Sequence, residues 1–128
     1  SLARGWSTLM MDAAGTPESS GIRIRSAITA NPWYLAGTGR FDTALIETTN
    51  GSVLSKVGAD GLHIAMAPAL GLVVASKAID GSRIAAEEGL VHLLLHDGAL
   101  TADEAERLPR ASVLDDAGRV VGAISVSS

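Results

Sequence analysis

The sequence predicts an α+β fold, in which a three-stranded antiparallel meander packs against helices. Between residues 53 and 79, side chains alternate between two faces with the period of two that is typical of strands. Turn sequences at residues 58–61 and 68–71 divide this stretch into three strands. Farther along, apolar residues recur at helical spacing and form a broad stripe suited to cover the meander: Ala86, Leu90, Leu93 and Leu94.

Two helices are expected at the start of the chain. Apolar residues at helical spacing predict an amphipathic helix over residues 2–14 that ends at Gly15, with Trp6 in the core. The Thr-Pro-Glu sequence of residues 16–18 predicts the start of a second helix, because it offers a capping hydroxyl, a proline at the first helical position and an acid in the first turn. We expect the Asn-Pro pair of residues 31–32 to end that helix.

A glycine-rich loop follows and opens the segment of the chain that is densest in chemically reactive side chains. Gly37 and Gly39 bracket Thr38, so the loop can adopt positive φ angles and lie close to a substrate or to neighbouring backbone. Trp33 and Tyr34 directly precede it. These two rings either line a pocket or fill the core, and we expect them to fill the core.

A short helix is predicted directly after the loop, over residues 41–46. Asp42 is expected to cap this helix while Arg40 points outward. The Asn-Gly pair of residues 50–51 then predicts a turn.

The strand after this turn carries a lysine near its end. Residues 52–57 alternate as a strand and place Lys56 on the face opposite Ser55. Gly58 begins the next turn, and its missing side chain is expected to leave open space beside Lys56. A lysine followed at the second position by glycine is a layout by which serine acyl-transferring enzymes line the edge of their active site.

The end of the chain predicts two helices and a hairpin. Ser82 or Asp80 can cap the helix that covers the meander. A capping-box pattern at residues 101–104 predicts a short helix to residue 108. Residues 111–126 read as a hairpin.

Composition bounds the class of protein. The 128 residues suffice for one domain, and 47% are hydrophobic while only 19% are charged, so we expect some apolar surface to be covered by a partner or by a missing half of the protein. The net charge of −4, with basic residues scattered along the chain, argues against nucleic acid. The absence of cysteine excludes disulfides and fits a reducing cytoplasm, and no apolar run or basic leader predicts a membrane span or secretion.

Three sequence blocks, in this order and at about this spacing, resemble the asparaginase II family of Rhizobium-type L-asparaginases. They are residues 36–43 (AGTGRFDT), residues 56–61 (KVGADG) and residues 77–81 (KAIDG), with Arg83 shortly after the last block. The match is close from residue 31 to residue 83 and resembles the C-terminal part of the family's sequence. One departure is Asp60, where glutamate is commoner.

This resemblance implies a fold of the serine β-lactamase and glutaminase kind, and hydrolysis of L-asparagine to aspartate and ammonia. In the family, one serine pairs with a lysine three residues later, and a second serine works with the lysine that matches Lys56. The resemblance thus implies that Lys56 is catalytic, and we expect the wall of the substrate pocket to be formed by Gly37, Thr38, Gly39, Arg40, Asp42 and Gly58. Family members also carry a zinc site with cysteine ligands.

Two of these features are missing from the sequence. No serine is followed by a lysine three positions later, and no cysteine is present. We therefore interpret residues 1–128 as a single, incomplete C-terminal domain, to which a missing N-terminal portion or a partner chain supplies the nucleophile. Neither the family's zinc site nor any other cofactor site is expected within this chain alone. We further expect a homo-oligomer in the cytoplasm.

Several readings remain open at this point. From spacing alone, Lys56 reads as an ordinary strand lysine, and only the resemblance favours catalysis. Lys77 and Asp80 match the family but are expected to fix a turn. His92, His96 and Glu88 share one helix face with the spacing of a metal clamp, although an exposed, solvated face is the preferred interpretation.

Three functions compete at the level of the whole protein. The first is part of an L-asparaginase. The second is an amidohydrolase for another amide, such as glutamine or a β-lactam. The third is a catalytically silent domain of the same fold that dimerises through its apolar surface.

Overall fold

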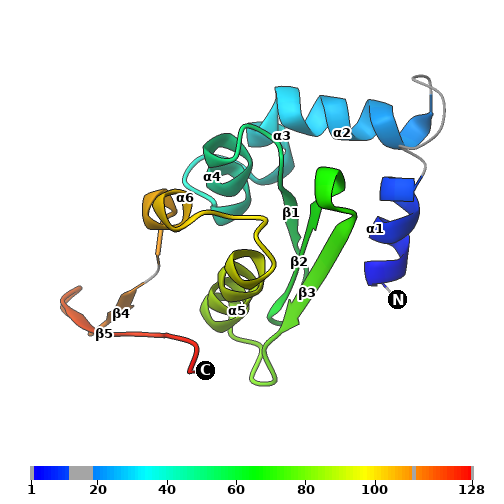
Figure 1. Cartoon of the computed structure of the whole chain (residues 1–128). Coiled ribbons are helices and arrows are strands. Elements are labelled where there is room, and N and C mark those ends of the chain that lie inside the picture. The colour runs from blue at the N-terminus through cyan, green and yellow to red at the C-terminus, as the bar shows by residue number, and fades with distance from the viewer. Residues whose placement is uncertain (1, 12–18, 111, 128) are drawn as a thin grey trace.

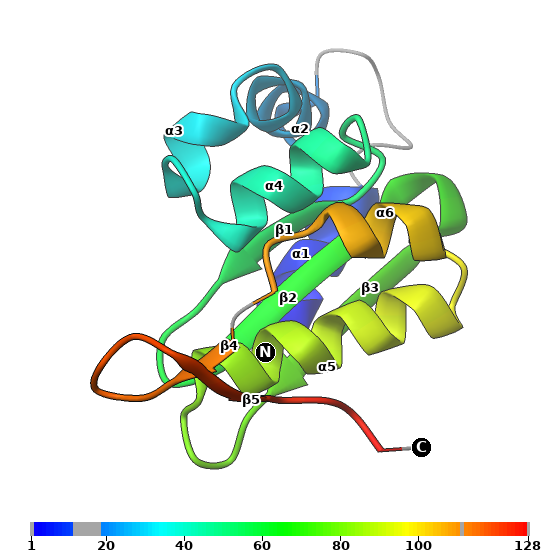
Figure 2. The same cartoon turned by 90° about the vertical axis from the view of Figure 1, so that its left-hand side faces the viewer.

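The centre of the molecule is a three-stranded antiparallel sheet with helices on both faces. The computed structural model describes residues 2–11, 19–110 and 112–127. The strands are β1 (Leu54–Val57), β2 (Leu62–Ala67) and β3 (Leu72–Lys77), in that order across the sheet. Figures 1 and 2 show α5 and α6 on one side of this sheet and α1 on the other. The predicted meander and the α+β class are confirmed.

The register of the sheet decides which side chains share a face. Lys56 lies opposite Ile64 on β2, and Val57 lies opposite His63. Because successive side chains of a strand point to opposite faces, Ser55 and His63 project from one face and Lys56 and Ile64 from the other.

The first face of the sheet is covered by α5 (Arg83–His96). Its N-cap is Ser82, whose hydroxyl accepts a hydrogen bond from the backbone N–H of Ala85 at 3.2 Å. The predicted stripe is confirmed, since Leu90 and Leu94 are fully buried against the sheet. Next comes α6 (Ala102–Arg107), and its predicted capping box is present.

The second face packs against α1 (Leu2–Met11), α2 (Ser20–Ala30) and α3 (Pro32–Ala36). Leu54 and Met66 of the sheet are buried there, with Trp6 and Ile28 packed against them. The side chain of Leu54 therefore packs against the helices on the second face, while the side chain of its neighbour Val53 is buried in the core on the first face.

One prediction about these helices falls outside the described residues, and another is wrong. The N-cap of α2 is Ser19, whose side chain accepts from Ile22 N–H at 3.4 Å, whereas the predicted capping residue, Thr16, and the predicted end of α1 lie outside the described residues. The expectation that Trp33 and Tyr34 fill the core is wrong, because they are 53% and 80% exposed. The Asn-Pro stop before them starts α3 at once, and this one-turn helix presents both rings to solvent.

The last segment is the predicted hairpin. It is formed by β4 (Ser112–Leu114) and β5 (Val120–Ala123), and its turn contains Gly118 with a φ of 76°. None of the helices in the described part of the chain combines the length and apolar character needed to cross a membrane.

Candidate functional site

The glycine-rich loop has the backbone that the sequence predicts. Gly37 and Gly39 have φ angles of 97° and 69°. The loop is held on both sides: Trp33 Nε1 donates to the Thr38 hydroxyl oxygen at 2.7 Å, and the Thr43 hydroxyl donates to the Gly37 carbonyl at 2.7 Å. The exposed indole of Trp33 thus has a role in fixing this loop.

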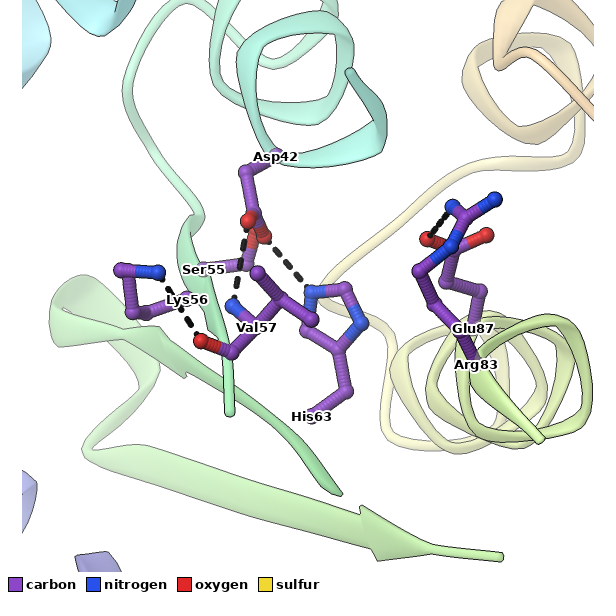
Figure 3. Close-up of polar contacts among 7 residues, drawn as sticks. All are labelled: Asp42, Ser55, Lys56, Val57, His63, Arg83 and Glu87. Atoms are coloured by element: carbon purple, nitrogen blue, oxygen red, sulfur yellow. Dashed lines mark hydrogen bonds and ion pairs between the residues drawn. The ribbon is translucent and has the colours of Figure 1, made fainter. Parts of the chain in front are cut away.

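Asp42 occupies a different position from the one predicted. The N-cap of α4 (Phe41–Thr48) is Arg40, which makes no capping bond with its side chain, so the prediction that Asp42 caps this helix is wrong. Asp42 instead lies in the first turn of α4 and points onto the sheet (Figure 3). It is only 2% exposed, so its carboxylate is enclosed and does not line an open pocket in the described structure.

The Asp42 carboxylate receives three hydrogen bonds from the sheet. Its Oδ1 accepts from the Ser55 hydroxyl at 2.6 Å and from His63 Nε2 at 2.6 Å, and its Oδ2 accepts from the Val57 backbone N–H at 3.0 Å (Figure 3). Ser55 and His63 are fully buried. The two lie on the same sheet face because β1 and β2 pair in the register described above, and α4 packs along β1.

The protonation of this cluster follows from its partners. Burial by itself raises the pKa of Asp42, but the hydrogen bond and charge of His63, with the bonds from Ser55 and Val57, outweigh burial and hold that pKa below its ordinary value of 3.8. Asp42 is therefore a carboxylate, to which His63 Nε2–H donates. The other ring nitrogen of His63, Nδ1, is buried and has no hydrogen-bond partner among the described residues.

Sequence reasoning missed His63 and Ser55. The available signal was a histidine within an otherwise apolar strand sequence, LHIAMA, which is costly to bury without a polar partner. That partner could not be named, because Asp42 lies 21 residues away from His63 along the chain.

Lys56 lies at the free edge of the sheet. Gly58 N–H donates to the Leu62 carbonyl across the β1–β2 pair, so the backbone groups of Val57, one residue earlier, point to the opposite, unpaired edge of β1. The ammonium of the half-buried Lys56 donates to the Val57 carbonyl at that edge, at 2.9 Å. The lysine is thus partly enclosed and bonded to its own strand.

The expected open space at Gly58 is absent. A Cβ atom at Gly58 would lie 3.2 Å from the side chain of Leu62, so the glycine lets Leu62 pack closely against the turn. The prediction that Gly58 opens a space beside Lys56 is wrong on this point.

Clefts lie elsewhere on the described surface. A cleft of about 520 Å³ is lined by residues of α2 and by Gly51, Leu54 and Ala69, and Lys56 is not among its lining residues. A smaller one, of about 130 Å³, includes Gly39 and Phe41. The structure therefore joins the glycine loop to the strand of Lys56 through the hydrogen bond between Asp42 and Val57. Neither of the two clefts described here is lined by both the glycine loop and Lys56.

The other polar candidates have structural partners. Lys77 contacts the carboxylate of Asp60 at 2.9 Å and also the Asp60 carbonyl, which ties the end of β3 to the β1–β2 turn. Glu88 is buried and paired with Arg110, so the expectation that it lies on an exposed rim is wrong. A metal clamp with His92 and His96 is not formed.

The residues present do not fit the zinc site implied by the resemblance. The chain has no cysteine, and within the described ranges no three His, Asp or Glu side chains converge in a way that could hold a metal ion.

Comparison with known proteins identifies the family. Residues 1–126 match the L-asparaginase II family. A search among curated proteins found no match. Because the family match extends over nearly the whole sequence and contains the glycine loop and the Lys56 strand in the order described, this chain belongs to the asparaginase II family.

Proposed function

We propose that the chain is part of an enzyme that hydrolyses L-asparagine to L-aspartate and ammonia, with Lys56 as the group that carries the proton of a serine nucleophile. The family match over residues 1–126 supports asparagine as the substrate. The nucleophile comes from protein outside these residues, since no serine here has a lysine three positions later.

One observation carries the role of Lys56: its ammonium lies at the edge of β1 with which no other strand of the described residues pairs. A segment of the remaining protein that approaches this edge would meet the Lys56 amine and the Val57 carbonyl side by side. A buried lysine within the sheet could not be reached in this way, and a fully solvated one would not hold a fixed position. The half-buried position of Lys56 meets both requirements.

The proposed reaction is acyl transfer in two steps. The side-chain nitrogen of Lys56 takes the proton of the serine hydroxyl as the serine oxygen attacks the side-chain amide carbon of asparagine. Proton return to the leaving nitrogen releases ammonia and leaves an aspartyl ester. Water then gives a proton to Lys56 as its oxygen attacks the ester carbon, and transfer of that proton to the serine oxygen releases aspartate and restores the serine hydroxyl. The loop of residues 37–40 is proposed to shape one wall of the pocket.

The first test is removal of the Lys56 amine. In the complete enzyme, Lys56→Met is expected to lower ammonia release from asparagine by at least about 100-fold, the lower range of general acid–base contributions. Lys77→Met is the matched control, since Lys77 is an exposed strand lysine paired with Asp60. Wild-type turnover by a folded Lys56→Met enzyme would remove Lys56 from the mechanism.

Substrate choice separates the competing functions. Ammonia release from asparagine but not from glutamine is expected, and preference for glutamine or for a β-lactam would assign the chain to another amidohydrolase. A complete protein that releases ammonia from neither amide and leaves a β-lactam intact would favour the silent domain.

We also propose that the sheet and α5 form part of a β-lactamase and glutaminase-like domain. The support is the order of the elements, three antiparallel strands followed by a helix that covers one face. A structure of the complete protein, in which further strands extend this sheet, would test the proposal.

A further inference from the structure

We infer that Asp42 is a positioning residue for Lys56: it holds the backbone of Val57 at the free edge of β1, and Ser55 and His63 hold Asp42. The catalytic consequence rests on the proposed function, whereas the positioning can be measured without any activity. The assignment replaces the expected place of Asp42 in the pocket wall.

The geometry links Asp42 to Lys56 through one residue. Val57 donates its N–H to Asp42 Oδ2 at 3.0 Å and offers its carbonyl to the Lys56 ammonium at 2.9 Å. Both groups point to the same side of β1, away from β2. An anchor on the Val57 N–H therefore also fixes the direction of the carbonyl that the lysine contacts.

The free edge explains why an anchor is needed. In the interior of a sheet, backbone groups on both sides of a strand are held by neighbours, but the outer groups of an edge strand have none. In the described part of the chain, β1 is the last strand on its side of the sheet. Asp42 supplies the acceptor that a neighbouring strand would otherwise supply at Val57.

Ser55 and His63 explain how the carboxylate keeps its orientation. Both donate to Oδ1, which leaves Oδ2 directed at Val57 (Figure 3). A buried carboxylate is costly unless several donors satisfy it, and here three do. Loss of one donor to Oδ1 lets the carboxylate turn, and the bond to Val57 weakens with it.

A purely structural role is the competing explanation, because Asp42 also fastens α4 to the sheet. Thr49 provides the matched control for that role. It is buried at the other end of α4, and its hydroxyl oxygen accepts from Val53 N–H at 3.3 Å while the hydroxyl donates to the Leu45 carbonyl at 2.8 Å. Thr49→Val removes a tie between the end of α4 and Val53, which directly precedes β1 and makes no hydrogen bond to Asp42 or Val57.

The first experiment follows backbone amide exchange and side-chain resonances by NMR in the complete protein. In Asp42→Asn, the amide offers one acceptor oxygen and one NH₂ group to the donors of the sheet. Exchange of the Val57 amide proton, relative to amides of β2, is expected to rise about tenfold, with a shift of the Lys56 side-chain resonances. Ser55→Ala, which keeps the charge and removes little volume, should cause a smaller change in the same direction.

The control decides the outcome. Thr49→Val is expected to leave the Val57 exchange rate, relative to β2, and the Lys56 resonances unchanged. If Asp42→Asn leaves them unchanged as well, or if Thr49→Val changes them equally, Asp42 does not position Lys56.

The second experiment measures kinetics in the complete enzyme. Asp42→Asn is expected to lower kcat for asparagine at least tenfold with little change in KM, because the amine acts on the chemical step. The comparison requires that Asp42→Asn and Thr49→Val have equal thermal stability. If kcat then falls no further in Asp42→Asn than in Thr49→Val, the inference is overturned. Absence of ammonia release from the wild-type enzyme would instead refute the proposed function and leave the NMR result standing.

Discussion

Asp42 carries an unusual concentration of hydrogen bonds for one side chain, since three donors from two strands converge on a carboxylate that is 2% exposed. Because these donors stabilise the charged form, the cluster makes the stability of the fold depend on pH. The pKa of Asp42 is held below its ordinary value of 3.8 in the folded chain, while the unfolded chain has the ordinary value. The stabilisation is therefore complete well above pH 3.8 and is lost as the pH falls below it.

This sign leads to a prediction for Asp42→Asn. At pH 7 the variant is expected to have a free energy of unfolding about 1–3 kcal/mol lower than that of the wild type, the range for a buried charge-assisted hydrogen-bond group. The difference should shrink as the pH is lowered through 4 toward 2. Urea unfolding at several pH values measures it. A constant difference across this range would show that Asp42 is not the titrating group.

Residue-level prediction worked where the backbone decides and failed where distant side chains meet. Gly37 and Gly39 were predicted to allow positive φ because glycine is common in such loops, and they have it. The partners of Asp42 could not be predicted, because Ser55 and His63 are 13 and 21 residues away from it and meet it only through strand register and the placement of α4. The sequence signal at Asp42 was equally compatible with a helix cap.

At the scale of elements, the β1–β2 turn and the turn between β3 and α5 meet at one end of the sheet through two glycines, Gly61 and Gly81. A Cβ atom on Gly61, in the β1–β2 turn, would lie 2.7 Å from the backbone carbon of Gly81, directly before the start of α5. Gly98, after α5, has a similar positive φ of 71° and open space around it. A comparison of alanine substitutions at Gly61 and Gly98 therefore separates the cost of a positive φ from the cost of a steric clash.

We predict that Gly61→Ala destabilises the chain more than Gly98→Ala. The latter adds only the cost of a positive φ, about 1 kcal/mol. Gly61→Ala adds a clash with backbone that cannot move without shifting α5, and we expect roughly 2 kcal/mol more, in the range of overpacked cores. Chemical denaturation of both variants measures the difference. Equal losses of stability in Gly61→Ala and Gly98→Ala would mean that the β1–β2 turn and the turn before α5 can move apart without a cost in free energy.

The positions of helices and strands along the sequence were more predictable than their packing in space. The capping box of α6, the Ser82 cap of α5 and the two-residue period of the meander are local signals, and all three are present in the structure. The exposure of Trp33 and Tyr34 was not predictable, because a one-turn helix has no periodicity from which a buried face can be read.

At the scale of the whole molecule, one ion pair joins the segment before the C-terminal hairpin to the helix that covers the sheet. Arg110 Nε donates to Glu88 Oε1 at 2.6 Å, and Arg110 Nη2 contacts the second carboxylate oxygen. Glu88 has only 6% of its side chain exposed, while Arg110 has 47%. In contrast, the pair between Arg119 and Asp115 lies within the hairpin itself, where the arginine is 79% exposed.

Removal of the two arginines should therefore have unequal effects. Arg110→Met leaves a buried carboxylate without its cation, and after allowance for solvent screening of the half-exposed arginine we expect a loss of about 1–2 kcal/mol in the free energy of unfolding. Arg119→Met should change it by less than about 0.5 kcal/mol, as for exposed pairs. Because Arg110 precedes β4 and Glu88 lies in α5, the Arg110→Met substitution should also increase amide exchange in β4 and β5 more than in β2. Equal stability of the two variants, with unchanged exchange in the hairpin, would show that the hairpin is not held to the domain through Glu88.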